Sequence, residues 1–145
     1  MAKVHHFKNF SVVSDGVNIE IDMSRLEKNF NEAQYRLDSA IMTSMEPLMP
    51  MQSGQFINVT KSMSAALAGT GQVVAAAPPM GRFLYEGNAM VGQYSRSAWA
   101  KKGEKKVLSG GKLNYSRGGP HWFDKAKERD MDSWEEVVKK AIGDG

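Results

Sequence analysis

Few residues in this chain are suited to catalysis or metal binding, and they lie far apart. The chain has three histidines: His5, His6 and His121. No His-x-x-x-His spacing or carboxylate pair accompanies them, so they do not match a zinc or iron ligand set. We expect His121 to help cap the helix that follows Pro120. The chain has no cysteine, which excludes a disulfide framework and a thiolate zinc site.

The serines, glycines and carboxylates offer no better case for an enzyme. Ser14 and Ser53 belong to turn-forming segments without the strand–serine–helix context of a nucleophile elbow. The segment 69–71 (Gly-Thr-Gly) is too short to cradle a phosphate, and no Gly-Lys-Ser/Thr sequence follows it. Acidic and basic residues alternate between Asp124 and Lys140, which predicts a solvated helix face. We therefore expect no catalytic residue, no metal and no cofactor.

A glycine-containing basic segment is the best candidate for a binding surface. Its cations are Lys101, Lys102, Lys105, Lys106, Lys112 and Arg117. Tyr94, Trp99 and Tyr115 lie beside or among them, and interleaved cations and aromatic rings are typical of proteins that bind single-stranded nucleic acid. Charge at a loop tip can also serve only to keep the loop solvated. The pattern leaves contact with DNA, contact with protein and a solvated loop open.

Length and composition indicate a single domain, 1–145. Of the 145 residues, 41% are hydrophobic and 24% charged, close to ordinary globular values, and the net charge is only +3. Ten methionines are many for this length, and we favour their use as flexible core filling over contact with partners. No apolar run approaches the ~18–20 residues of a membrane span. Because the N-terminus lacks the apolar stretch of a signal peptide, we expect synthesis in the cytoplasm.

The first part of the sequence predicts a hairpin and then a long helix. Apolar and polar residues alternate over 10–21 on either side of a Ser-Asp-Gly turn at 14–16, which is typical of two short strands. Ser24 and Glu27 match a capping box, and an apolar stripe at three- and four-residue spacing continues until Pro47. This predicts an amphipathic helix of about six turns, roughly 33 Å long.

The middle of the sequence is less periodic. Residues 55–68 fit either a strand or a short helix, whereas 72–77 match a strand of small residues stopped by the prolines that follow. We expect a helical turn at 81–86. Residues 87–119 predict an extended loop or hairpin arm, with its turn at 109–111 (Ser-Gly-Gly).

A second long helix is predicted to run from Pro120, because proline is favoured at the first helical position. Asp132 and Glu135 match another capping box, which predicts a break near Asp130. Together the elements predict an α+β fold. A long N-terminal amphipathic helix and a C-terminal helix pack on a small, mostly antiparallel sheet, with an extended loop or hairpin arm.

Three segments, in this order, resemble the neck proteins of tailed bacteriophages. They are Pro50-Met51-Gln52-Ser53-Gly54, Arg82-Phe83-Leu84-Tyr85-Glu86-Gly87, and Gly119-Pro120-His121-Trp122-Phe123-Asp124-Lys125-Ala126-Lys127 followed by Trp134. The third segment is the most specific, and the resemblance covers roughly 30–142. Proteins of this kind are described as minor capsid, head-tail joining or tail-completion proteins. The strands before Ser24 lie outside the pattern, and their role stays open.

The resemblance implies a structural virion protein without enzymatic activity, made in the host cytoplasm and located at the head–tail junction. It implies a homo-oligomeric ring, six-fold in preference to twelve-fold, with no membrane contact. The implied partners are adjacent neck, portal-adaptor or tail-tube proteins, with passing contact to viral DNA. The residues expected at a subunit or partner interface are Phe83, Tyr85, Tyr94, Trp99, Lys101, Lys102, Lys105, Lys106, Trp122 and Phe123.

Three points stay open at this stage. The pair Trp122–Phe123 anchors the last helix either to the core or to a neighbouring subunit. The alternative function is a small basic nucleic-acid-binding module that uses the Lys101–Arg117 segment. A third alternative is an assembly factor that is absent from the mature particle.

Overall fold

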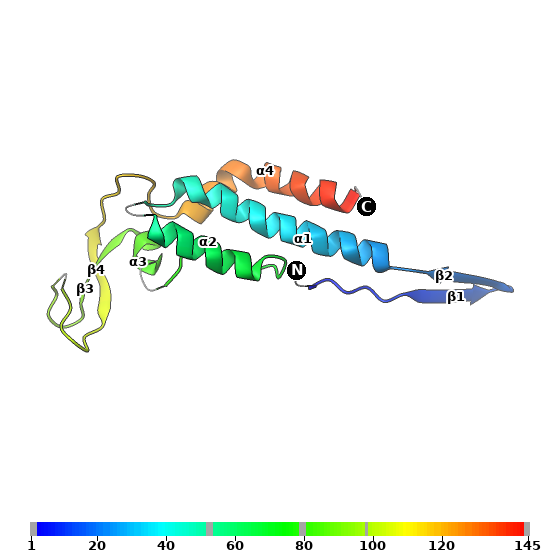
Figure 1. Cartoon of the computed structure of the whole chain (residues 1–145), viewed down its shortest axis with the longest axis horizontal. Coiled ribbons are helices and arrows are strands. Elements are labelled where there is room, and N and C mark those ends of the chain that lie inside the picture. The colour runs from blue at the N-terminus through cyan, green and yellow to red at the C-terminus, as the bar shows by residue number, and fades with distance from the viewer. Residues whose placement is uncertain (1–2, 52–53, 79–80, 98, 144–145) are drawn as a thin grey trace.

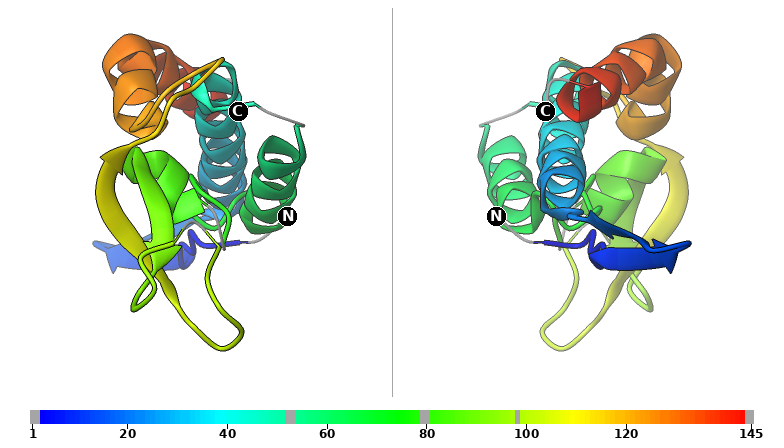
Figure 2. Two further views of the ribbon diagram at one scale, coloured as in Figure 1. Left: turned by 90° about the vertical axis from the view of Figure 1, so that its left-hand side faces the viewer. Right: turned by 90° about the vertical axis from the view of Figure 1, so that its right-hand side faces the viewer.

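Three helices lying side by side form the body of the molecule. The computed structural model describes residues 3–51, 54–78, 81–97 and 99–143. In it, α1 (Ser24–Met45) lies between α4 (Trp122–Gly143) and α2 (Gln55–Leu67), as Figure 1 shows. The end-on views of Figure 2 show the same order. The most extensive contact between helices is that of α1 with α4, which run in opposite directions.

The other elements are short. They are the 3₁₀ turn η1 (Glu46–Leu48), α3 (Gly81–Glu86), β1 (Phe10–Ser14), β2 (Val17–Ile21), β3 (Asn88–Gly92) and β4 (Lys106–Lys112). The strands form two separate antiparallel pairs, β1 with β2 and β3 with β4. The predicted α+β class with long N-terminal and C-terminal helices is confirmed. The two strand pairs lie at opposite ends of the long axis of the molecule (Figure 1).

The core lies where the three helices meet and is rich in methionine and tryptophan. Its buried members are Met42, Met45, Met49, Ile57, Trp122, Ala126 and Trp134. Met45, Met49 and Trp122 are completely buried, so these methionines fill the core as expected. The Trp122 indole N–H donates to the carbonyl of Ala75 at 2.8 Å, which satisfies the one polar atom of the side chain.

The helix α1 spans 24–45 as predicted and ends before Pro47, but its predicted capping box is wrong. Ser24 is the first helical residue rather than the cap. Its amide and hydroxyl both donate to the Asp22 carboxylate, at 2.9 and 2.6 Å. These bonds, the hydroxyl first, lower the pKa of Asp22. The Glu27 carboxylate does not close the capping box, because it accepts a hydrogen bond from the Phe7 amide at 3.5 Å.

Residues 55–67 form the helix α2, and the strand predicted at 72–77 is wrong. The backbone of this segment bonds to hydroxyl groups of α2 instead of to another strand. Val74 exchanges two hydrogen bonds with the Ser64 hydroxyl, at 2.8 and 3.0 Å, and the Ala77 amide donates to the Thr60 hydroxyl at 3.2 Å. The small side chains of 72–77 allow its backbone to lie close to α2, and the composition of the segment alone does not reveal that contact.

The predicted break near Asp130 is also wrong, because α4 is continuous from Trp122 to Gly143. Tertiary contacts keep the helix in register across this point. The Trp134 indole N–H donates to the Ser44 hydroxyl at 2.9 Å, and Arg129 donates to the Ser44 carbonyl at 3.0 Å. Arg129 also forms an ion pair with Asp130 at 2.7 Å, and its hydrogen bond lowers the pKa of Asp130. These contacts outweigh the local capping signal.

The chain before the first hairpin is tied to α1 by one buried amide side chain. Asn31 Oδ1 accepts from the Val4 and His5 amides, both at 3.0 Å, and its Nδ2 donates to the His5 carbonyl at 2.9 Å. The Phe7 ring packs edge-on against Phe30, with centroids 5.2 Å apart. The start of the hairpin is therefore held at a defined place on the body.

The hairpin of β1 and β2 projects beyond the body (Figure 1). Its turn lies at Asp15 and Gly16 as predicted, with φ of 50° and 78°, the left-handed pair that a tight two-residue turn requires. All ten strand residues are exposed. The register opposes Phe10 with Ile21 and Val12 with Ile19, so one face of the hairpin is apolar and lies in solvent.

The molecule has far more surface than a globule of its mass. Its accessible area is 9842 Å². A compact monomer of 16.0 kDa would expose about 7,400 Å² by the scaling of area with mass, so the excess is about one third. The projecting hairpins account for this shape, since both stand outside the helical body.

Candidate interaction surfaces

The predicted arm is a hairpin, although its turn is not at 109–111. We call residues 88–112 the arm. β3 and β4 pair from Asn88 opposite Lys112 to Gly92 opposite Lys106, so 93–105 form the connection. The Ser-Gly-Gly segment lies inside β4, near an irregularity in the register between Asn88 and Met90. The chain instead reverses direction within 93–105, where the side chain of Glu104 accepts hydrogen bonds from backbone amides.

That carboxylate is Glu104, which organises the tip of the arm. Its Oε1 accepts from the amides of Tyr94 and Ser95 at 2.8 and 2.7 Å. Its Oε2 accepts from the Lys101 amide and the Ser95 hydroxyl, both at 3.0 Å. These bonds to the charged form, led by the Ser95 amide, lower the pKa of Glu104 to about 2. The residue therefore stays ionised at all but strongly acidic pH.

Gly92 makes room for this arrangement. A Cβ at this position would overlap Glu104 Oε1 and the Ser95 hydroxyl oxygen, so a larger residue would displace these two side chains from their hydrogen bonds. The Gly92 backbone also holds the turn, because its amide donates to the Ser97 carbonyl at 2.8 Å and its carbonyl accepts from the Arg96 amide at 3.0 Å. A glycine in β3 and a carboxylate twelve residues later together build the tip.

The tip displays the aromatic and basic residues that the sequence singled out. Tyr94 is 82% exposed and Trp99 is 87% exposed. The four predicted interface lysines are exposed on the same loop or at the start of β4: Lys101, Lys102, Lys105 and Lys106. Exposing a large indole to water is unfavourable unless a partner covers it. The arm tip is therefore the stronger of the predicted interaction surfaces.

The other predicted interface residues lie in the body. Phe83 and Trp122 are buried, which assigns Trp122 to the core, the first of its two predicted positions. Tyr85 packs edge-on against Trp122 with ring centroids 4.8 Å apart, and Phe123 stacks on Trp134 at 6.3 Å. The structure thus divides the predicted interface set into an exposed group on the arm and a group packed within the chain.

His121 contributes to the start of α4 through its backbone. Its carbonyl accepts from the Lys125 amide at 3.2 Å, and its own amide donates to the Tyr85 carbonyl at 2.9 Å. The residue has a φ of 54°, and its ring packs edge-on against Tyr85. The helix predicted to run from Pro120 therefore begins two residues later, at Trp122.

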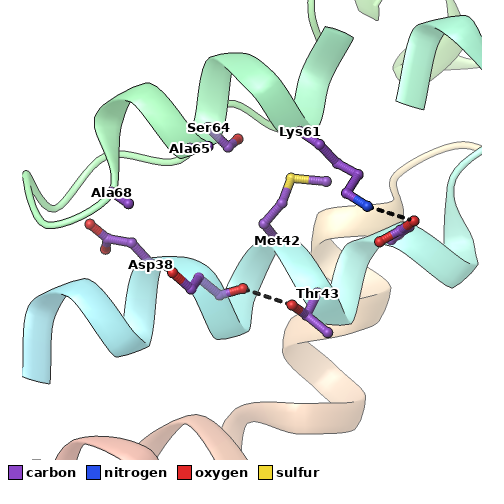
Figure 3. Close-up of a pocket in the computed structure, with 9 residues that line it drawn as sticks. Asp38, Met42, Thr43, Lys61, Ser64, Ala65 and Ala68 are labelled. Atoms are coloured by element: carbon purple, nitrogen blue, oxygen red, sulfur yellow. Dashed lines mark hydrogen bonds and ion pairs between the residues drawn. The ribbon is translucent and has the colours of Figure 1, made fainter. Parts of the chain in front are cut away.

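A shallow groove lies between α1 and α2 (Figure 3). Its volume of about 200 Å³ is below the range of ordinary small-molecule sites. The buried Asp38 on its wall already has partners, since Oδ2 accepts from the Gly69 and Gly71 amides at 2.9 and 3.0 Å. Lys61 on the other wall forms an ion pair with Glu46 at 3.2 Å. The groove is best explained as a helix–helix junction held by Asp38.

The described part of the chain contains neither a metal-binding cluster nor a membrane-spanning helix. Within 3–51, 54–78, 81–97 and 99–143, no group of three or more histidine, aspartate or glutamate side chains is placed to hold a metal ion. No helix in this part of the chain is both long and apolar enough to cross a membrane. Comparison with protein-family models, with curated proteins and with solved structures found no match.

The apolar face of the first hairpin is a surface that sequence reasoning did not identify. Its residues are Phe10, Val12, Val17, Ile19 and Ile21, which are 37% to 57% exposed. The alternation that predicted the strands was visible, but alternation usually means that the apolar face lies on a core. The sequence did offer one signal. The two five-residue strands are followed within three residues by the start of α1, so the chain has no further strand or helix at this point to cover the apolar face.

Proposed function

We propose that this protein is a structural virion component of a tailed bacteriophage that forms a ring in the neck and joins the head to the tail. The proposal takes its identity from the resemblance of the three sequence segments. The observation that supports it is the shape of the chain, a small helical body with a hairpin at each end and about one third more surface than a compact monomer. A subunit of this shape gains most of its burial from neighbours.

The division of the surface suits a ring. A cyclic ring uses contacts in which one face of a subunit meets a different face of the next. The two hairpins lie at opposite ends of the molecule and expose different side chains, so they provide unlike faces. Extended hairpins can also bind a neighbouring subunit through main-chain hydrogen bonds, because the backbone groups at their edges can pair with another strand. The role proposed is assembly, without a chemical step.

Mass spectrometry of purified phage particles tests the neck role. The chain should be present in the mature particle at a fixed ratio to the portal protein, and an antibody label should lie at the head–tail junction. A chain that is abundant in lysates but absent from particles would instead identify an assembly factor. A label on the capsid surface or along the tail would contradict the neck position.

We expect the purified chain to be monomeric or weakly associated at low concentration. Association has a cost of about 4–15 kcal/mol in lost freedom of motion, and each hairpin presents only a few apolar residues to offset it. A docking partner that positions several copies removes much of this cost. Sedimentation velocity across a dilution series checks the expectation, which a stable closed ring at low concentration would contradict.

The second candidate function is binding of single-stranded nucleic acid by the arm. The observation that favours it is the exposure of Trp99 and Tyr94 beside four exposed lysines on one loop. Four lysine–phosphate contacts would give a slope of about −3 for the logarithm of affinity against the logarithm of salt concentration. A titration with a fluorescent oligonucleotide measures it. Binding that is absent at low salt would exclude this function.

A further inference from the structure

The two hairpins carry opposite charge. The first hairpin and its base, 10–22, contain three carboxylates and no lysine or arginine. The carboxylates are Asp15 at the turn, Glu20 in β2 and Asp22 at the base. The arm, 88–112, contains six cations and a single carboxylate, Glu104, which is engaged by backbone amides. Within the described residues no ion pair involves the hairpin carboxylates or the arm lysines.

The two hairpins also carry apolar surface of complementary kinds. The first hairpin presents the flat face of Phe10, Val12, Val17, Ile19 and Ile21. The arm presents Tyr94 and Trp99, which are more exposed than any residue of that face. Aromatic side chains against β-branched ones are among the favourable pairings between strands, and tryptophan and tyrosine are the residues that most often dominate a protein interface.

One molecule cannot bring these surfaces together. The hairpins lie at opposite ends of the long axis, with the helical body between them (Figure 1). Both ends are anchored to that body. Asn31 of α1 accepts the amides of Val4 and His5, both at 3.0 Å, just before the first hairpin, and the Tyr115 hydroxyl just after the arm donates to the Leu84 carbonyl of α3 at 2.5 Å. A contact between the two surfaces must therefore join two copies.

We propose that the apolar, acidic hairpin of one copy binds the aromatic, basic arm of the next copy, head to tail. The apolar face covers Tyr94 and Trp99, and the carboxylates at the turn and base of the hairpin lie beside the arm lysines. The excess surface of the chain is about 2,400 Å², which exceeds the roughly 1,600 Å² that one subunit buries in two standard interfaces, so both ends can be occupied at once. The inference rests on the proposed ring and deepens it, because it names the two unlike faces through which neighbouring subunits of that ring would meet.

Cysteine cross-linking tests the contact directly, since the chain has no cysteine of its own. One preparation carries Val12→Cys on the apolar face, and a second carries Gln93→Cys beside Tyr94. Mixed at high concentration and oxidised, they should form a disulfide between the two different variants. Two matched controls should give little product: Val13→Cys, which points to the opposite face of β1, and Glu135→Cys on α4.

Reversal of charge sharpens the test. Combining Asp15→Lys, Glu20→Lys and Asp22→Lys with Val12→Cys should lower the yield roughly tenfold. The reciprocal preparation, which should lose a similar amount, carries Lys101→Glu, Lys102→Glu, Lys105→Glu and Lys106→Glu with Gln93→Cys. Mixing the two charge-reversed preparations should restore the cross-link. Glu20 and the four lysines are exposed, so these changes should leave the thermal melt unchanged. Asp22→Lys removes the acceptor of the Ser24 bonds and Asp15→Lys occupies a turn position with a φ of 50°, so the first preparation should melt somewhat lower than the parent chain. Circular dichroism checks that its helix content is retained, and recovery of the cross-link on mixing separates a loss of charge pairing from a loss of fold.

Four results would overturn the proposal. They are equal yields from Val12→Cys and Val13→Cys, a dominant Val12–Val12 product, loss of yield that mixing does not restore, and no cross-link at any concentration. The outcome is separable from the neck role. A restored cross-link with the chain absent from virions would keep the contact and remove the neck function, whereas a labelled neck without the cross-link would do the reverse.

Discussion

The tryptophans of the body and the arm show how differently two regions of one small protein use the same side chain. Trp122 is completely buried, donates to the Ala75 carbonyl and lies between two aromatic rings. Trp99 is 87% exposed at the tip of the arm. Burial in the body stabilises the chain itself, whereas an exposed indole can stabilise only an assembly. The body is thus built for folding and the hairpins for contact.

The polar groups repeat this difference. In the body, buried Asp38 accepts two amides of the segment that follows α2 and so fixes one helix against another. In the arm, Glu104 accepts three amides and a hydroxyl of its own loop. One carboxylate joins distant parts of the chain, and the other shapes a local display. Substitutions should therefore affect global stability in the first case and local order in the second.

The largest effect should come from Trp122→Ala. Loss of the buried indole should lower the free energy of unfolding by about 3–5 kcal/mol, because it leaves a cavity beside Phe56 of α2 and Tyr85 of α3 and removes the hydrogen bond to Ala75. A chemical denaturation curve measures this change. Trp99→Ala is the matched control and should lie within about 0.5 kcal/mol of the parent chain. Equal effects of the two changes would refute the division between body and arm.

Asp38→Ala should rank next, at about 2–3 kcal/mol, since the Gly69 and Gly71 amides would lose their acceptor in a largely buried place. Asp38→Asn should cost less because it keeps one acceptor oxygen. Glu32→Ala, which removes the exposed pair with Arg36 on the same helix, should cost no more than about 0.5 kcal/mol. Thermal melts of the three variants provide the comparison.

Glu104→Gln should disorder the arm tip without changing the melting temperature. The amides of Tyr94, Ser95 and Lys101 should lose protection from hydrogen exchange, because a neutral amide group cannot accept all their bonds. In the parent chain the pKa of Glu104 is lowered from 4.5 to about 2. Its contribution to the order of the tip is therefore fully present above pH 4.5 and is lost as the pH falls through about 2. Protection that disappears already near pH 4.5 would contradict this geometry.

The smallest effect on stability should come from changing the four arm lysines to serine. These positions are exposed, and isolated surface charges contribute about 0–1 kcal/mol per pair. We expect an unchanged melt but slower or misregistered joining of the subunits, with Trp99→Ala weakening joining more. Yield of infectious particles provides the measurement. If both the four-lysine variant and deletion of 95–114 leave the yield intact, the arm is a passive solvated loop.

Local sequence patterns predicted those elements whose conformation depends mainly on their own residues. The stripe and the proline that bound α1, the Asp-Gly turn of the first hairpin and the short helix at 81–86 all depend on nearby residues. The failures share a cause. The segment 72–77 bonds to the hydroxyls of Thr60 and Ser64, and α4 is held straight at Asp130 by contacts with Ser44, so distant partners overrode local signals.

The sequence alone determined the length of α1, the first hairpin with its turn, and the cluster of lysines with Tyr94 and Trp99. Only the tertiary structure decided which aromatic residues are available to a partner, because burial depends on which elements meet. In the structure Trp122 and Phe83 are buried in the body, whereas Trp99 is exposed to solvent. It also left the apolar face of the first hairpin in solvent, at the far end from the basic arm. Alternation of residue types specifies a face, but only packing specifies what covers it.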